Sequence, residues 1–190
     1  GFHTTIIERG TDVHKRVEGI REFEKTGVFN PVSNYAFGEG GAGTFSDGKL
    51  TSRSKHISKE RQFILSSYIS AGATEEIGYM AHPLLGSDNL RKIVRNLRDA
   101  FSDIGGSVLF ETMLEDLKIK DGKVIEAITT SGGIEADYFI IAPGHSAYET
   151  YRMLIRRGVQ FRTKSFAIGS RVEHPQEIIN KAQWGRERLP

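Results

Sequence analysis

The chain has 190 residues, a formal net charge of +2, 38% hydrophobic residues and no cysteine. This composition excludes a disordered chain, disulfides and cysteine metal sites, and the near-balanced charge argues against nucleic-acid binding. No apolar run approaches the roughly 18 residues of a membrane span, and histidines without metal-ligand spacing predict no metal site. We therefore expect a cytoplasmic globular protein.

A strand followed by a helix is expected at the start. Residues 4–7 are a short β-branched run that ends at a turn, which is typical of a strand. Asp12 predicts the N-cap of a helix that ends near Gly27, because apolar residues recur at helical spacing between them. The chain enters its first strand without a preceding cap, and we expect it to be a piece of a longer polypeptide.

A glycine-rich loop follows at residues 38–50, with the sequence GEGGAGTFSDGKL and five glycines. Ordered glycine loses much backbone entropy, so this density indicates backbone that turns sharply or approaches a ligand closely. Thr44, Ser46 and Lys49 add two hydroxyls and a cation, which suits a phosphate or another anionic, planar ligand. The alternative is a flexible loop without a ligand, although such linkers rarely contain the apolar residues present here.

Residues 51–104 are expected to form a helical insertion. The pattern favours a helix over residues 58–70 and a short helical piece that opens at Thr74. A clear amphipathic helix follows, and Ser87 or Asp88 is expected to cap its start.

The apolar spacing then changes to that of strands. Runs at 107–110, 114–120 and 123–130 are followed by another at 134–142, and Asp121-Gly122 is typical of a hairpin turn. We expect a three-stranded antiparallel β-meander within about residues 107–142. Its final part, residues 138–142, is apolar throughout and is expected to be central in a sheet.

The C-terminal part alternates helix and strand. Helices are expected at residues 147–157 and 176–182, with a strand at 166–173 between them. Strands that alternate with helices predict an α/β fold, in which residues 1–165 form one domain and 166–190 begin another.

Three features are expected to converge on a ligand. In an open α/β sheet, ligands bind beyond the carboxyl ends of the strands. Glu8, the glycine loop and residues 142–145 all follow predicted strands or lie near their ends. An acidic residue that closes a strand often accepts hydrogen bonds from ribose hydroxyls, and a solvated strand end is the alternative for Glu8.

Four segments resemble the uncharacterised FAD-dependent dehydrogenases of the two-dinucleotide-binding-domain flavoprotein type. They are IERG at 7–10, FGEGGAGTFSDGKL at 37–50, APGHS at 142–146 and FAIGSRVEHP at 166–175. The resemblance runs along essentially the whole chain. It implies a partial FAD/NAD(P)-binding, Rossmann-like domain from the middle of an FAD-dependent oxidoreductase. Such an enzyme would act on a small-molecule substrate, with NAD(P)H as a candidate electron donor.

The resemblance also implies residue roles. Glu8 and Arg9 would contact the adenosine ribose, Leu114 the adenine, and the glycine loop the pyrophosphate and the flavin. The implied cofactor-binding residues are Glu8, Arg9, Gly38, Gly40, Gly41, Ala42, Gly43, Thr44, Phe45, Ser46, Asp47, Gly48, Lys49, Leu50, Leu114, Ala142, Pro143, Gly144 and His145. The implied substrate-side residues are Arg171, Glu173 and His174. His145 is the candidate catalytic residue, with a loop histidine bonded to backbone as the alternative.

The sequence also departs from the family pattern. The Gly-x-Gly-x-x-Gly unit and the C-terminal segment that closes over the flavin are both absent. Where the family has a Pro-His pair before Gly-Thr-Asp, Pro83 precedes Leu-Leu-Gly-Ser-Asp and a histidine stands at position 82. A missing first strand predicts an exposed sheet edge that would allow self-association. A non-redox nucleotide- or phosphate-binding module and a fragment inactive on its own remain open as alternative functions.

Overall fold

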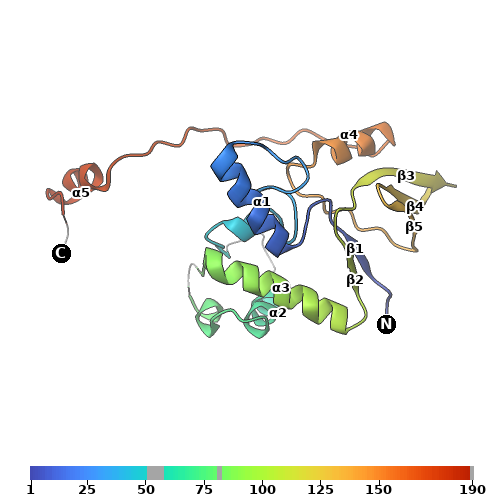
Figure 1. Cartoon of the computed structure of the whole chain (residues 1–190), viewed down its shortest axis with the longest axis horizontal. Helices are drawn as coiled ribbons and strands as arrows, with labels where there is room; N and C mark the ends of the chain where they lie inside the picture. Colours follow the sequence, from blue (N-terminus) through green and yellow to red (C-terminus); the bar gives the residue numbers. More distant parts are fainter. Residues whose placement is uncertain (51–57, 81–82, 189–190) are drawn as a thin grey trace. The chain divides into compact units, whose positions relative to one another are not determined.

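The computed structural model describes residues 1–50, 58–80 and 83–188. Contacts divide the chain into two units, Gly1–Val159 and Gln160–Pro190, and each is described by itself. The first unit is mixed α/β, as expected, and contains a parallel strand pair and a three-stranded antiparallel sheet (Figure 1). The finer Rossmann-like assignment and the substrate-side identity of residues 166–190 stay predictions.

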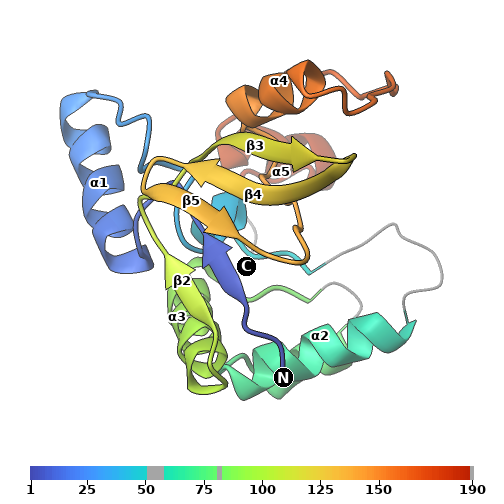
Figure 2. The ribbon, with the colours of Figure 1, turned by 90° about the vertical axis from the view of Figure 1, so that its right-hand side faces the viewer.

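A parallel pair of short strands carries the first part of the site. Strand β1 (Thr5–Ile7) pairs with β2 (Ser107–Leu109) so that Thr5 lies opposite Ser107 (Figure 2). The N–H of Glu8 continues the pairing to the carbonyl of Leu109 at 2.9 Å. Both strands were expected, but β2 was wrongly placed within the meander, because periodicity does not reveal the partner of a strand.

Helix α1 (Val13–Thr26) has the ends that its sequence predicts. The Asp12 carboxylate accepts hydrogen bonds from the N–H groups of His14 and Lys15, and the N–H of Gly27 donates to the carbonyl of Phe23. These contacts satisfy backbone groups that a helix leaves unpaired at its termini.

The helical insertion forms its own small core. Helix α2 (Ser58–Ser70), the 3₁₀ helix η2 (Glu75–Gly78) and helix α3 (Ser87–Asp103) surround a cluster of buried apolar residues. The members of this core are Leu65, Ala71, Ala73, Ile77, Leu85, Leu90 and Ile93. Residues 51–57 of the expected insertion, and the histidine at position 82, lie outside the described residues.

The start of α3 corrects a prediction. Its N-cap is Gly86, which provides no side-chain hydrogen bond, rather than Ser87 or Asp88. The carboxylate of Asp88 instead lies in the first turn and pairs with Arg91 at 2.8 Å. A negative charge in the first turn favours the helix dipole, so Asp88 still stabilises this end of the helix.

The β-meander is shorter than expected. It comprises β3 (Leu114–Lys120), β4 (Lys123–Thr129) and β5 (Gly132–Glu135), paired antiparallel in that order. Its first hairpin turns at Asp121 and Gly122, both with positive φ, as predicted. Helix α4 (Tyr148–Arg156) packs against the meander through a second core of Leu117, Ala127, Met153 and Leu154.

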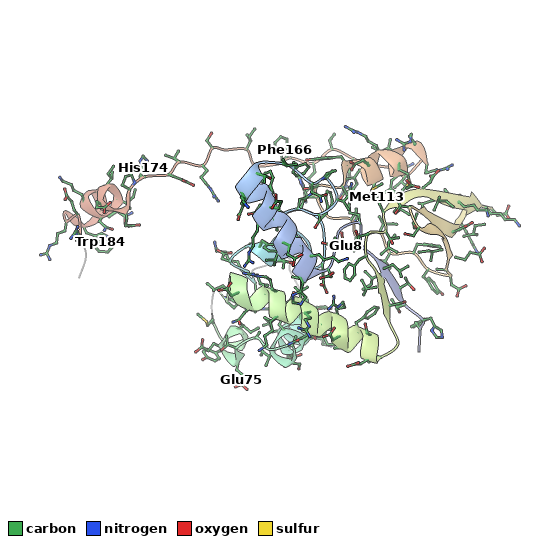
Figure 3. The ribbon with its side chains drawn as sticks, viewed as in Figure 1. Glu8, Glu75, Met113, Phe166, His174 and Trp184 are labelled. Atoms are coloured by element: carbon green, nitrogen blue, oxygen red, sulfur yellow. The ribbon has the colours of Figure 1, made fainter. Side chains whose placement is uncertain are left out.

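Two predicted strands are absent from the described residues. The segment at 138–142 follows the end of β5 without strand structure, and Ile140 is 93% exposed. The segment at 166–173, in the second unit, is likewise extended without a partner, with Phe166 82% exposed (Figure 3). A strand needs a neighbour to bond its backbone groups, and the described residues place none beside either segment. The second unit then forms helix α5 (Gln176–Trp184), as expected.

None of the helices in the described ranges combines the length and the apolar character needed to cross a membrane.

Candidate functional site

The end of β1 and the glycine loop meet at the carboxylate of Glu8 (Figure 3). Its Oε1 accepts hydrogen bonds from the N–H of Gly10 at 2.8 Å and from the N–H of Gly38 at 3.0 Å. The two backbones come so close that a Cβ on Gly10 would lie well under 3.0 Å from the nitrogen of Gly38. Glycine at position 10 is therefore a steric requirement of this junction.

The loop is a folded element and not a flexible linker. Gly41–Phe45 form a 3₁₀ turn, η1, and Thr44 is buried within it. The hydroxyl of Thr44 donates to the carbonyl of Glu39 at 3.2 Å. The hydroxyl of Ser46 donates to the carbonyl of Gly43 at 2.7 Å and accepts from the N–H of Gly48 at 3.0 Å. Both hydroxyls expected to bind a ligand thus hold the loop together.

The cation of the loop is also paired. The ammonium of Lys49 lies 3.0 Å from a carboxylate oxygen of Asp47, and both side chains are exposed. Its hydrogen bond to Asp47 lowers the pKa of that carboxyl. Because the pair is solvated, it contributes little to stability, and Lys49 remains able to exchange this partner for a ligand anion.

A buried arginine clamps the loop to α1. Arg16 has no exposed surface, and its guanidinium donates to the carbonyls of Glu39 at 2.7 Å and of Asn34 and Tyr35 at 3.0 Å. The same group lies 4.8 Å from the ring centre of Phe45. Burial lowers the pKa of Arg16 to about 10, although the neighbouring carboxylates oppose this shift, so it stays charged at neutral pH.

Glu39 links the loop to both flanking helices. Its Oε2 accepts from the N–H of Val13, in the first turn of α1, at 2.7 Å and from Arg98 of α3 at 3.2 Å. Together with Asp12, it occupies the first amides of α1, which are the anion-binding groups of a helix N-terminus. The other oxygen of Glu39, Oε1, is buried and has no hydrogen-bond partner.

A cavity of about 570 Å³ lies beside these groups. This volume is within the range of about 300–1,000 Å³ common for small-molecule sites. Its wall is mainly apolar, from α3 and the strand pair, and its polar residues include Glu8 and Glu39. The lining residues used below are Glu8, Glu39, Leu50, Leu90, Ile93 and Arg98.

Not every predicted site residue reaches this cavity. Leu50 lines it, but Phe45 packs on Arg16 and edge-on against Tyr35. Arg9 lies over the ring of Phe37 at 4.1 Å and pairs with Glu149 of α4 at 3.4 Å.

The remaining predicted residues lie elsewhere. Leu114 packs in the core of the meander. The residues at 142–145 follow no strand; the carbonyl of Gly144 accepts from Tyr151, and His145 contacts the ring of Tyr148 at 6.3 Å. Arg171, Glu173 and His174 belong to the second unit. Within the described residues, acidic and histidine side chains form no group able to hold a metal ion.

Sequence reasoning missed Arg16, Glu39 and Arg98. Arg16 carried one usable signal, because it stands between Val13 and Ile20 at helical spacing and so falls on the buried face of α1. Glu39 and Arg98 carried none, since they are 59 positions apart and meet only through the fold.

Comparison with known proteins identifies an uncharacterised relative. No family model matches the chain. The chain is similar to an uncharacterised protein of Clostridium beijerinckii (strain ATCC 51743 / NCIMB 8052), with 44% identity over 185 residues. The alignment covers 97% of this chain and 34% of that protein. The chain thus spans about a third of the length of this curated relative.

Proposed function

We propose that this chain is an internal portion of an FAD-dependent oxidoreductase and that its cavity forms part of the FAD site. The observation that carries the proposal is the convergence of Glu8 with the glycine loop. The carboxylate of Glu8 binds the N–H of Gly38 at 3.0 Å, and Glu8 and the loop line the same cavity. A strand-end acid beside a close-approaching loop is the arrangement that nucleotide recognition uses.

The residues present fit the sugar and ring portions of FAD. Within the described residues, Oε2 of Glu8 has no hydrogen-bond partner and would accept from ribose hydroxyls. Leu50, Leu90 and Ile93 provide an apolar wall suited to a planar ring. FAD would supply the hydride-accepting ring, while the protein supplies position and electrostatics.

The fit to the pyrophosphate is weaker. Carboxylates of Asp12 and Glu39 occupy the first amides of α1, and the hydroxyls of Thr44 and Ser46 bond within the loop. Among the cations of the loop and α3, Lys49 and Arg98 line the cavity. We therefore assign the described residues chiefly to the ribose and ring of the cofactor.

The test uses the relative and the chain in parallel. The full-length C. beijerinckii protein is expected to purify yellow and to release FAD on denaturation. FAD is then titrated into the 190-residue chain and its Glu8→Gln variant, with flavin fluorescence as the readout. Loss of one charge-assisted hydrogen bond predicts binding about tenfold weaker in the variant.

Glu115→Gln is the matched control, because this exposed acid of β3 does not line the cavity. A colourless relative together with a chain that does not bind FAD would overturn the proposal. Colourless proteins that bind ADP through Glu8 would instead support a nucleotide-binding module without redox activity.

A further inference from the structure

We propose that Glu39 is a ligand-binding residue whose Oε1 accepts a hydrogen bond from a sugar hydroxyl of the molecule that fills the cavity. This inference rests on the proposed function only for the identity of the ligand as FAD. The recognised chemistry is a polyhydroxyl group attached to an apolar ring, found in both the ribityl chain of a flavin and the ribose of a nucleoside.

The hydrogen bonds of Glu39 leave one oxygen unused. Oε2 accepts from Val13 at 2.7 Å and from Arg98 at 3.2 Å, whereas Oε1 is buried without a partner. The side chain of Glu39 is 93% buried, since 7% of its surface is exposed. Buried acceptors are nearly always satisfied in folded proteins, and an exception is a mark of a missing partner.

The place of Glu39 points to a ligand as that partner. Three side-chain atoms in the described residues are buried without a hydrogen bond: Arg9 Nε, Arg91 Nε and Glu39 Oε1. Glu39 is the one of these residues that lines the cavity. Its conformation is also fixed from two sides, by the first turn of α1 and by α3. A positioned acceptor at a cavity wall is the usual source of orientation in a small-molecule site.

The charges around the cavity select a donor-rich group without negative charge. Glu8 and Glu39 line the same cavity, so a phosphate beside them meets two carboxylates. Hydroxyls, by contrast, donate to carboxylate oxygens through short, strong hydrogen bonds. The apolar residues of α3 complete a site for a ring that carries a hydroxylated chain or sugar.

The first test removes the hydroxyls from the ligand and leaves the protein unchanged. Riboflavin and lumiflavin share the flavin ring, but lumiflavin lacks the ribityl hydroxyls. Adenosine and 2′,3′-dideoxyadenosine form the equivalent pair for the ribose. Calorimetric titration of the 190-residue chain is expected to give at least tenfold tighter binding of the hydroxylated member in one pair, and that pair identifies the source. Equal affinities in both pairs, or no binding of any of the four, overturn the inference.

The second test changes Glu39. In Glu39→Gln the side-chain carbonyl still accepts from Val13, while an NH₂ group replaces Oε1 and cannot accept. We expect the hydroxylated ligand to bind about tenfold more weakly and the ligand without hydroxyls to bind as before. Glu135→Gln, an exposed acid of β5, is the matched control. Equal weakening of both ligands would show a purely structural role and would overturn the inference.

The two proposals fail differently. If adenosine binds through Glu39 and no flavin binds, the oxidoreductase proposal fails and the Glu39 inference stands. If FAD binds and Glu39→Gln changes nothing, the oxidoreductase proposal stands and the Glu39 inference fails. Thermal unfolding of each variant, expected to match the parent chain within a few degrees, ensures that binding is compared between folded proteins.

Discussion

The carboxylate of Glu8 and the backbone N–H of Gly38 form a 3.0 Å hydrogen bond across 30 positions of sequence. The bond joins the end of β1 to the start of the glycine loop, and with it the strand pair to the cavity. Its partner bond to Gly10 makes Glu8 a structural acceptor with one carboxylate oxygen. The other oxygen is the part that a ligand would use.

Gly10→Ala is expected to destabilise the chain by about 1–3 kcal/mol, because the new methyl would overpack the backbone at Gly38. The nearest atoms to that methyl all belong to the backbone of Phe37 and Gly38, which cannot rotate away as a flexible side chain could. Gly43→Ala is the control, since a Cβ there meets nothing within 4 Å. Urea unfolding of both variants measures the difference, and equal midpoints would contradict the close approach.

Arg16→Met is expected to lower stability by about 3 kcal/mol or more, because it strands several buried carbonyls without donors. The guanidinium of Arg16 bonds the carbonyls of Asn34, Tyr35 and Glu39. Arg21→Met, at an exposed position of α1, should change stability by less than about 0.5 kcal/mol. A similar small effect of both variants in chemical denaturation would refute the clamp.

Ser46→Ala is expected to reduce stability by about 1 kcal/mol and to leave ligand affinity nearly unchanged. Its hydroxyl bridges Gly43 and Gly48 within the loop, so its role is to fold the loop. Ser102→Ala, on the exposed surface of α3, serves as the comparison. If Ser46→Ala weakens ligand binding without changing stability, the hydroxyl belongs to the ligand instead.

The ion pair between Asp116 and Arg157 predicts a pH dependence. Hydrogen bonding from Arg157 lowers the pKa of Asp116 from 3.8 to about 2. Since the folded-state pKa is depressed, the pair stabilises the fold fully above pH 3.8, and this contribution disappears as the pH falls through about 2. Carboxyl NMR titration should place the midpoint of Asp116 near 2 in the parent chain.

Arg157→Gln should return that midpoint toward 3.8, whereas Arg156→Gln should move it only slightly, because Arg156 acts through charge alone and ranks last among the causes. Equal shifts in the two variants would contradict the bond between Arg157 and Asp116.

Elements whose signals lie within a few residues could be predicted from sequence. Asp12 at the N-cap of α1 and the Asp121-Gly122 turn act through backbone groups two or three positions away, so neighbours in sequence decide them. The segment at 138–142 shows the limit of this reasoning. Its apolar run is a strand signal, but a strand forms only beside a partner, and the described residues provide none.

For the candidate site, the sequence by itself determined which chemical groups are available: a strand-end acid at Glu8, a dense run of glycines, and no cysteine. Only the tertiary structure decided their roles. It directs the hydroxyls of the loop inward, buries Arg16 beneath Phe45 and leaves Oε1 of Glu39 unpaired at a cavity. The physical reason is that hydrogen bonding and burial depend on distances in space, and the residues concerned, such as Glu39 and Arg98, are far apart in the chain.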